Sequence, residues 1–182
     1  MDNSPNTLKQ GTPFGCFINC YAMVKSYYVD GFEFNKDDEL DLLEKSFRFD
    51  RGCYEPHLIN ELMQDHSVEV FIESDYLVWK YQKLSENLGN KIDPEHKIML
   101  SGDYREAVKT GLGIVLLDKW SLDMYTHFAH WVVISGYSDS YFTVNDSWTG
   151  REIQMPKTRF MDSIKSLRNN LNCSPVLVSV EK

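Results

Sequence analysis

Apolar residues recur at helical spacing along the first part of the chain. After a Pro-Phe-Gly turn, positions 16–27 place small or apolar side chains three or four residues apart, which predicts an amphipathic helix that begins at or near Cys16. The same spacing returns at positions 37–47 and 56–65. Pro56 stands in the first turn of the second of these, where proline is tolerated. We therefore expect helices at all three places.

A strand interrupts the helical pattern. Positions 68–73 alternate between apolar and polar residues as a strand does, and positions 75–89 return to helical spacing and end at a glycine. The stretch that follows, up to Ser101, is polar and resembles a linker. The first half of the chain is thus predicted to be mostly helical.

The pattern changes at Asp103. A short helix is predicted at positions 103–111, where it ends at a glycine, and an apolar run follows at 112–118. Beyond it, segments separated by Gly, Asp, Ser and Asn predict strands at positions 130–137, 141–146, 151–155 and 175–180. We expect an antiparallel sheet, with a helix at positions 157–167 that covers the sheet or its edge.

A helical half followed by a strand-rich half predicts an α+β fold, in which the helix that begins at Cys16 packs against the later antiparallel sheet. The chain has 182 residues, of which 42% are hydrophobic and 25% charged, so it is long enough to bury a core and is neither disordered nor of low complexity. We expect residues 1–182 to form a single domain.

The charge balance disfavours polyanionic partners. Nineteen Lys and Arg against 27 Asp and Glu give a formal net charge of −8, so nucleic acid is not an expected partner. No apolar run approaches the roughly 20 residues of a membrane span, and the first ten residues lack the basic and apolar segments of a signal peptide. We therefore expect no membrane association and a cytoplasmic location.

The four cysteines are too few and too scattered for a disulfide scaffold, so free thiols are expected. Cys16 with Cys20, and His127 with His130, are close pairs in sequence, but neither has the partners that the ligand spacing of a zinc site requires. We expect no metal and no cofactor.

Cys16 stands at the start of a predicted helix, where unpaired backbone N–H groups and the helix dipole favour the thiolate. This position suits a nucleophile, although an isolated cysteine is more often a small buried hydrophobe. Cys20, one turn later, is expected to be such a buried residue.

A thiol nucleophile needs a base that takes its proton and a third group that orients the base. His130 opens an apolar strand and Asp146 ends the next one, so adjacent antiparallel strands would bring the two together. Taken one at a time, His130 also fits a core histidine, and Asp146 with Ser147 also fits a turn. Gln10, six residues before Cys16, fits either an oxyanion donor or an exposed loop residue.

The segment QGTPFGCFINCYAM resembles the active-site segment of C39-type papain-like cysteine peptidases. Its Gln10 stands six residues before Cys16. Those peptidases often carry a second cysteine four residues after the nucleophile and an Ala-Met pair just beyond it, and Cys20, Ala22 and Met23 match these positions.

A second segment, HWVVISGYSDSYFTVND, is similar to the histidine strand of the same family and the strand after it. It begins at His130 and ends at Asp146, with an aromatic residue and two valines directly after the histidine. The run LGIVLLD resembles the strand that precedes the histidine strand. The resemblance extends over about residues 10–146 and has little detail between 28 and 101.

The resemblance implies a papain-like cysteine protease fold and a thiol mechanism. It assigns Cys16 as the nucleophile, His130 as general acid and base, Asp146 as the residue that orients His130, and Gln10 as an oxyanion donor. His127 has no apolar strand behind it, so it is expected in a loop or at a rim.

The sequence departs from the family pattern beside the nucleophile. The family often has an acidic residue before the nucleophile and a glycine after it, whereas Gly15 and Phe17 stand here. A bulky Phe17 would close the narrow channel that suits a double-glycine leader peptide, unless it points into the core. The departure therefore leaves the substrate open.

The implied chemistry is acyl transfer through a thioester on Cys16. Relatives of this kind include amide-forming acyltransferases, some supplied by carrier proteins. We favour an acyltransferase that passes an acyl group from a carrier-protein or pantetheine thioester to an amine. A C39-like peptidase that hydrolyses a peptide such as a double-glycine leader is the alternative, and an inactive binding module is the third hypothesis.

Two further features bear on the partners of such an acyltransferase. Aromatic residues near His130 are candidates for the wall of an acyl pocket, and Lys157 with Arg159 would suit an acidic carrier protein. The aromatic residues considered are Trp79, Trp120, Tyr125, Phe128, Trp131 and Trp148.

Overall fold

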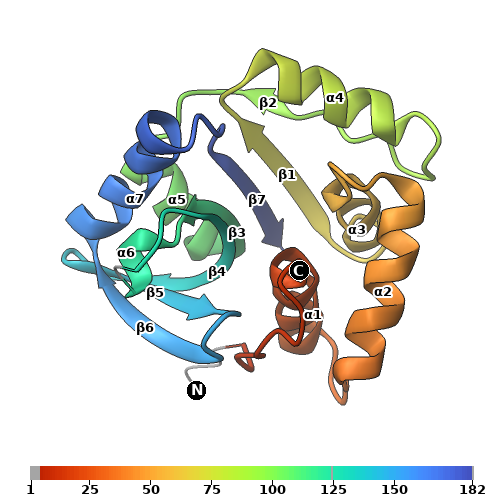
Figure 1. Ribbon diagram of the computed structural model, residues 1–182, viewed down its shortest axis with the longest axis horizontal. Helices are drawn as coiled ribbons and strands as arrows, with labels where there is room; N and C mark the ends of the chain where they lie inside the picture. Colours follow the sequence, from red (N-terminus) through yellow and green to blue (C-terminus); the bar gives the residue numbers. More distant parts are fainter. Residues whose placement is uncertain (1–4, 124, 182) are drawn as a thin grey trace.

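The computed structural model describes residues 5–123 and 125–181. Helices and strands fall in the two halves expected from the sequence (Figure 1). The first half contributes four helices: α1 (Cys16–Tyr28), α2 (Lys36–Phe49), α3 (Glu55–Leu62) and α4 (Asp75–Ser85). The second half contributes three more: α5 (Ser101–Thr110), α6 (Trp120–Asp123) and α7 (Lys157–Asn170).

The strands form one seven-stranded sheet in the order β2-β1-β7-β3-β4-β5-β6. They are β1 (Ser67–Ile72), β2 (Glu95–His96), β3 (Gly111–Asp118), β4 (Ala129–Tyr137), β5 (Tyr141–Asp146), β6 (Arg151–Pro156) and β7 (Val176–Glu181). All neighbouring pairs are antiparallel except β1 and β2, which are parallel. The α+β fold with an antiparallel sheet is therefore confirmed, with one short parallel pair at the edge.

Strand β1 joins the two halves of the chain. It pairs along its whole length with β7, the last strand of the sequence. The sheet therefore continues from the helical half into the strand-rich half, and Figure 1 shows β1 and β7 side by side between the two groups of helices.

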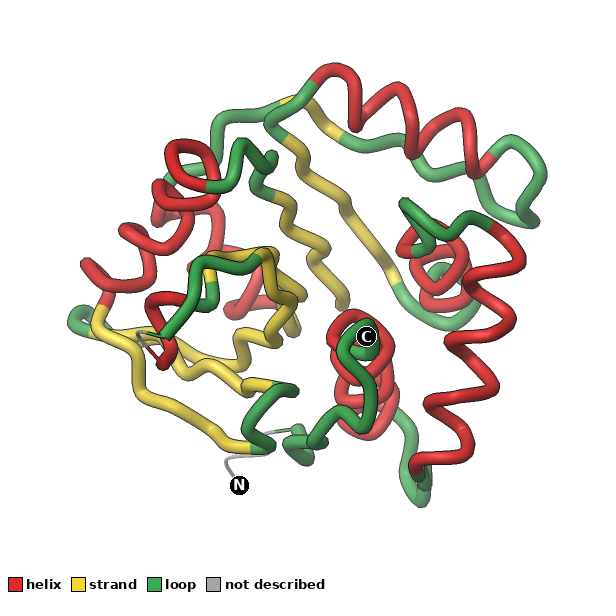
Figure 2. The backbone as a smooth tube through the Cα atoms, viewed as in Figure 1, coloured by secondary structure: helices red, strands yellow, loops and turns green. Residues whose placement is uncertain are grey.

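Two apolar cores lie against the two faces of the sheet. One contains residues of α1 and α3 together with Trp131 and Val133 of β4, and the other contains residues of α5 and α7 together with Val132 and Ile134. Consecutive residues of β4 alternate between the two cores because side chains along a strand point to opposite faces. Figure 2 shows the helices gathered on both sides of the strands.

Helix α1 is more buried than an amphipathic surface helix. Its residues are buried without interruption from Cys16 to Val24, because the helix is covered by the sheet on one side and by other helices of the first half. Phe17 packs edge-on against Trp131 of β4, with ring centroids 4.8 Å apart. The expected packing of this helix on the sheet is thus confirmed.

A local signal in the sequence explains where α2 begins. Helix α2 begins at Lys36 because the Asn35 side chain accepts hydrogen bonds from the first-turn N–H groups and Asp38 bonds back to the Asn35 N–H. Two short elements, α6 and β2, were not predicted from the sequence; they are four and two residues long. The stretch expected as a linker therefore contains a short strand. No helix in the described ranges is long and apolar enough to cross a membrane.

Candidate active site

Cys16 is the first residue of α1, and its side chain is 7% exposed. Burial raises the pKa of its thiol to about 11, although the backbone N–H groups of Trp131, Phe17 and Cys16 itself act in the opposite direction. The expectation that the helix start favours the thiolate is therefore wrong for the free protein. Desolvation outweighs the helix N-terminus, so the resting thiol keeps its proton at neutral pH.

His130 and Asp146 meet as the sequence predicts. His130 is the second residue of β4, Asp146 is the last residue of β5, and the two strands are neighbours in the sheet. The imidazole Nε2 lies 2.7 Å from Asp146 Oδ1, and both side chains are 1% exposed. Within the described ranges no hydrogen bond reaches Nδ1 of His130, so the carboxylate engages one ring nitrogen and leaves the other for a different partner.

The turn after β5 surrounds the Asp146 carboxylate with donors. The Trp148 N–H donates to Oδ1 over 3.0 Å, and the Thr149 N–H and hydroxyl donate to Oδ2 over 3.1 and 2.6 Å. Burial works to raise the pKa of Asp146, but the hydrogen bonds from His130 and Thr149 hold it below its ordinary value. Asp146 is therefore ionised at neutral pH, and Trp148 covers His130 edge-on with ring centroids 6.5 Å apart.

Helix α1, which carries Cys16, packs against strand β4, which carries His130. The backbone N–H of Trp131, the residue that follows His130, acts on the Cys16 thiol and lowers its pKa. No hydrogen bond joins the thiol to the imidazole in the part of the chain that the structure describes. The structure thus brings the thiol to the correct strand and pairs the histidine with its carboxylate.

Gln10 is held next to Asp146 by Ser147. The Gln10 backbone N–H donates to the Ser147 carbonyl over 2.7 Å, and the Ser147 hydroxyl donates to Gln10 Oε1 over 3.0 Å. The Gln10 amide Nε2 donates to the Thr12 carbonyl over 2.7 Å. Gln10 is therefore a positioned residue and its donor group is engaged within its own loop. Ser147 was considered from sequence only as part of a turn, and its place directly after Asp146 was the one available signal.

Glu39 of α2 fixes the loop that leads to Cys16. Its buried carboxylate accepts hydrogen bonds from the Gly11 N–H over 2.7 Å and from the Thr12 N–H and hydroxyl over 3.0 and 2.9 Å. A Cβ atom at Gly15 would collide with this carboxylate. Glu39 thus fills the space that a side chain at position 15 would take. In the resembling family this position, directly before the nucleophile, often carries an acidic residue. No sequence signal pointed to Glu39.

Phe17 does not close the site. Its side chain is fully buried in the core and contacts Trp131 and Tyr54 edge-on. A pocket of about 370 Å³ opens on the Cys16 thiol, with walls that include Leu116, Phe128 and Trp131. Glu55, a residue that the sequence did not single out, also lines this pocket.

A separate hollow of about 530 Å³ lies beside Gln10. It is lined by Gln10 and Lys9 from the N-terminal segment and by Trp148, Thr149 and Arg151 from the turn after β5. The two hollows share no lining residue, so the Cys16 side and the Gln10 side of the site offer different surroundings.

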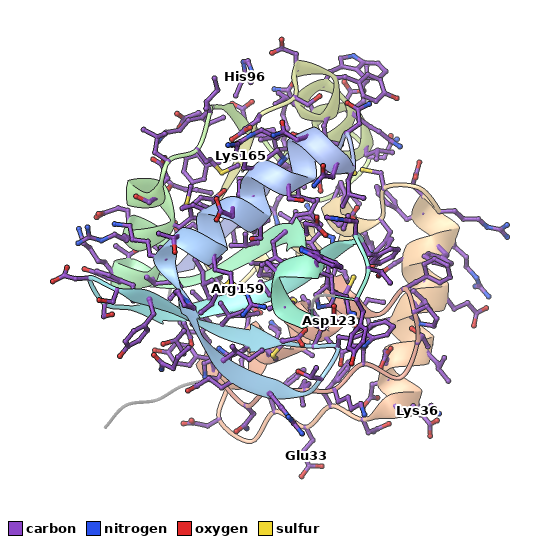
Figure 3. All side chains as sticks on the ribbon, turned by 60° about the vertical axis from the view of Figure 1, so that its left-hand side comes forward. Glu33, Lys36, His96, Asp123, Arg159 and Lys165 are labelled. Carbon is purple, nitrogen blue, oxygen red and sulfur yellow. The ribbon has the colours of Figure 1, made fainter. Side chains whose placement is uncertain are left out.

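Other candidate residues have structural places. Cys20 is fully buried, as predicted. His127 lies in the loop before β4, as expected, and its Nδ1 is 2.6 Å from the buried Asp118 Oδ2. Arg159 of α7, labelled in Figure 3, is exposed, and Lys157 at the start of the same helix is half-buried.

Comparison with known proteins places the chain in a family. No curated protein matches it. The model of the Peptidase_C39 like family matches residues 5–170, a range that includes Gln10, Cys16, His130 and Asp146. The chain therefore belongs to the Peptidase_C39 like family and is related to the papain-like cysteine peptidases.

Proposed function

We propose that the protein is a cysteine acyltransferase that forms an amide from a carrier-protein or pantetheine thioester and an amine. Cys16 is the nucleophile, His130 the general acid and base, Asp146 the residue that orients His130, and Gln10 an oxyanion donor. The chain from residue 1 to 182 acts as one domain in this proposal. The hydrogen bond between the buried His130 and Asp146 carries it, because this contact sets the imidazole tautomer that a thiol nucleophile needs.

The first half-reaction makes the acyl-enzyme. His130 Nδ1 accepts the Cys16 proton while Nε2 stays bonded to Asp146, and the sulfur attacks the thioester carbonyl carbon. The Gln10 amide exchanges the Thr12 carbonyl for the oxyanion, beside the backbone N–H of Cys16. The tetrahedral intermediate collapses, the substrate C–S bond breaks, and the departing thiolate takes the proton from His130.

The second half-reaction releases the acyl group. An amine attacks the carbonyl carbon of the Cys16 thioester, and His130 accepts a proton from the amine nitrogen. The C–S bond to Cys16 then breaks, which gives the amide and returns the proton to the thiolate. Because burial favours the neutral thiol, proton transfer between Cys16 and His130 is needed in both half-reactions.

The shape of the site supports an acyl substrate larger than a glycine pair. Phe17 packs in the core instead of narrowing the site, and the pocket at the thiol has a volume of about 370 Å³ with mostly apolar walls. Such a pocket suits a bulky acyl group. The family match by itself favours the second candidate, a peptidase, in which water takes the place of the amine.

Acyl transfer is tested by intact-protein mass spectrometry with alkyl and aryl pantetheine thioesters, with and without diamines. We expect a mass increase equal to the acyl group on the wild type, faster loss of this adduct with the amine present, and formation of the amide product. Cys16→Ser is the control that shows no adduct. An adduct that water removes as fast as the amine does, with no amide formed, would support the peptidase instead.

A further inference from the structure

Glu55 places a carboxylate in the pocket that contains the Cys16 thiol. Within the described residues it is the only charged residue that lines this pocket. Apolar and aromatic side chains, among them Leu77, Tyr81 and Phe128, form much of the remaining wall. A substrate group that enters the pocket therefore meets one carboxyl group in otherwise weakly polar surroundings.

The Glu55 carboxylate is not neutralised by a partner of its own. No ion pair reaches it within residues 5–123 and 125–181. The cation that acts on it most is Lys80, which lies 3.8 Å from Asp50 and does not line the pocket. The Trp131 indole N–H and the Cys53 thiol act to lower the pKa of Glu55, and neither of them carries a positive charge.

The position of Glu55 in the chain explains why a carboxylate is tolerated there. Glu55 is the first residue of α3, and Pro56 follows it in the first turn. A helix N-terminus stabilises a negative charge, and the backbone N–H of Glu55 acts in that direction. Burial acts in the opposite direction and raises the pKa of Glu55 above its ordinary value. A cation in the pocket would relieve this cost.

We propose that Glu55 selects acyl groups that carry an ammonium or guanidinium group, which it binds inside the Cys16 pocket. The proposal rests on the proposed acyl transfer and names its substrate class. It also couples binding to reaction: the Glu55 charge disfavours the Cys16 thiolate, and a bound cation cancels that effect. Glu55 is thus a specificity-determining residue that does not take part in the bond changes.

Charge selectivity at Cys16 can be measured without any acyl substrate. Methanethiosulfonate reagents of similar size with an ammonium, a neutral or a sulfonate end group each form a mixed disulfide, as the Cys16 thiolate displaces methanesulfinate. The protein carries Cys53→Ser and Cys173→Ser, because both of these cysteines line the pocket. Rates are followed by intact mass and are divided by the rates of the same reagents with free cysteine.

At low salt we expect this normalised rate to be at least about tenfold higher for the cationic than for the anionic reagent. The reason is that the interaction between Glu55 and the end group of a reagent inside the pocket is weakly screened at low salt. Added salt and Glu55→Gln should both reduce the preference, and Glu55→Asp should retain it. Glu61→Gln is the matched control, because it removes the same charge from α3 outside the pocket. Equal normalised rates in the starting protein would overturn the proposal even if Glu55→Gln failed to fold.

A pair of thioesters separates this proposal from the proposed function. 5-Aminopentanoyl and hexanoyl pantetheine have acyl chains of equal length, and only the first carries a cation. We expect about tenfold faster acylation of Cys16 by the first. Equal acylation by both would refute selection by Glu55 and leave acyl transfer intact. Acylation by neither, together with a cation preference of the thiosulfonates, would support the Glu55 site and refute acyl transfer.

Discussion

The buried Asp146 carboxylate accepts four hydrogen bonds, so its replacement tests both its role in stability and its role in orienting His130. His130 Nε2 and the Trp148 N–H donate to Oδ1, and the N–H and hydroxyl of Thr149 donate to Oδ2. Asp146→Ala leaves all four donors without this acceptor. Removing one partner of a buried charged pair costs about 3–5 kcal/mol of folding stability.

Asp146→Asn can keep the two hydrogen bonds that Oδ1 accepts. Its amide oxygen can replace Oδ1, which preserves the bond from His130, while its NH₂ group meets the Thr149 N–H, which cannot reverse its direction. One unsatisfied or opposed donor costs about 1–3 kcal/mol. We expect Asn to lose less stability than Ala and to retain the imidazole tautomer. Acylation of Cys16 should therefore fall by less than about tenfold in Asp146→Asn and by about 10²-fold or more in Asp146→Ala.

Urea unfolding and the acylation rate of Cys16 measure the two effects. The pH dependence provides a further check, because the pKa of Asp146 is lower in the folded than in the unfolded state. Its contribution to stability is present above its unfolded pKa, near 4, and is lost as pH falls through the lower folded value. Asp146→Asn should lack this loss on acidification. An Ala variant as stable and as fast as the wild type would show that the Asp146 carboxylate neither stabilises the turn nor orients His130.

Three other substitutions test the surroundings of the nucleophile. Phe17→Ala should cost about 3–5 kcal/mol of folding stability, measured by thermal or urea unfolding, because it leaves a cavity in the core. The control Phe14→Ala, at an exposed position, should change stability by less than about 0.5 kcal/mol, and equal effects would contradict the core position of Phe17. Gly15→Ala should destabilise the protein by about 1–3 kcal/mol, because the Glu39 carboxylate occupies the space that a Cβ atom at position 15 needs. Adding Glu39→Ala to this variant should offset part of the loss, and strictly additive effects in the double-mutant cycle would argue against the clash. Ser147→Ala should lower the rate constant of Cys16 acylation by about tenfold with little effect on substrate affinity, because the Gln10 amide oxygen loses the hydroxyl that positions the amide group. An unchanged rate constant would remove Ser147 from the site.

Patterns with a short period in the sequence predicted the elements that form the site. Two neighbouring strands predicted at 130–137 and 141–146 were enough to bring His130 close to Asp146, because one residue opens its strand and the other ends the next, antiparallel strand. The helix at Cys16 was also predictable from its spacing. Its complete burial was not, since the covering helices are positioned by tertiary contacts that no local pattern encodes.

The residues that sequence reasoning missed act across long separations. Glu39 bonds to Gly11 and Thr12 from another helix, and Glu55 reaches the Cys16 pocket from α3. Neither carboxylate has a spacing that relates it to Cys16. The lowered thiol pKa was predicted from the helix start alone, and burial, which depends on the whole fold, reversed it.

In the proposed mechanism Cys16 and His130 react as one unit. The most direct test is the rate at which a pantetheine thioester acylates Cys16 in the wild type and in His130→Ala, followed by intact mass at neutral pH. The loss of a general base should slow acylation by about 10²–10⁴-fold, and the difference should shrink as the pH approaches the thiol pKa of about 11, where the thiolate forms unaided. Equal rates in the two proteins at neutral pH would contradict the account.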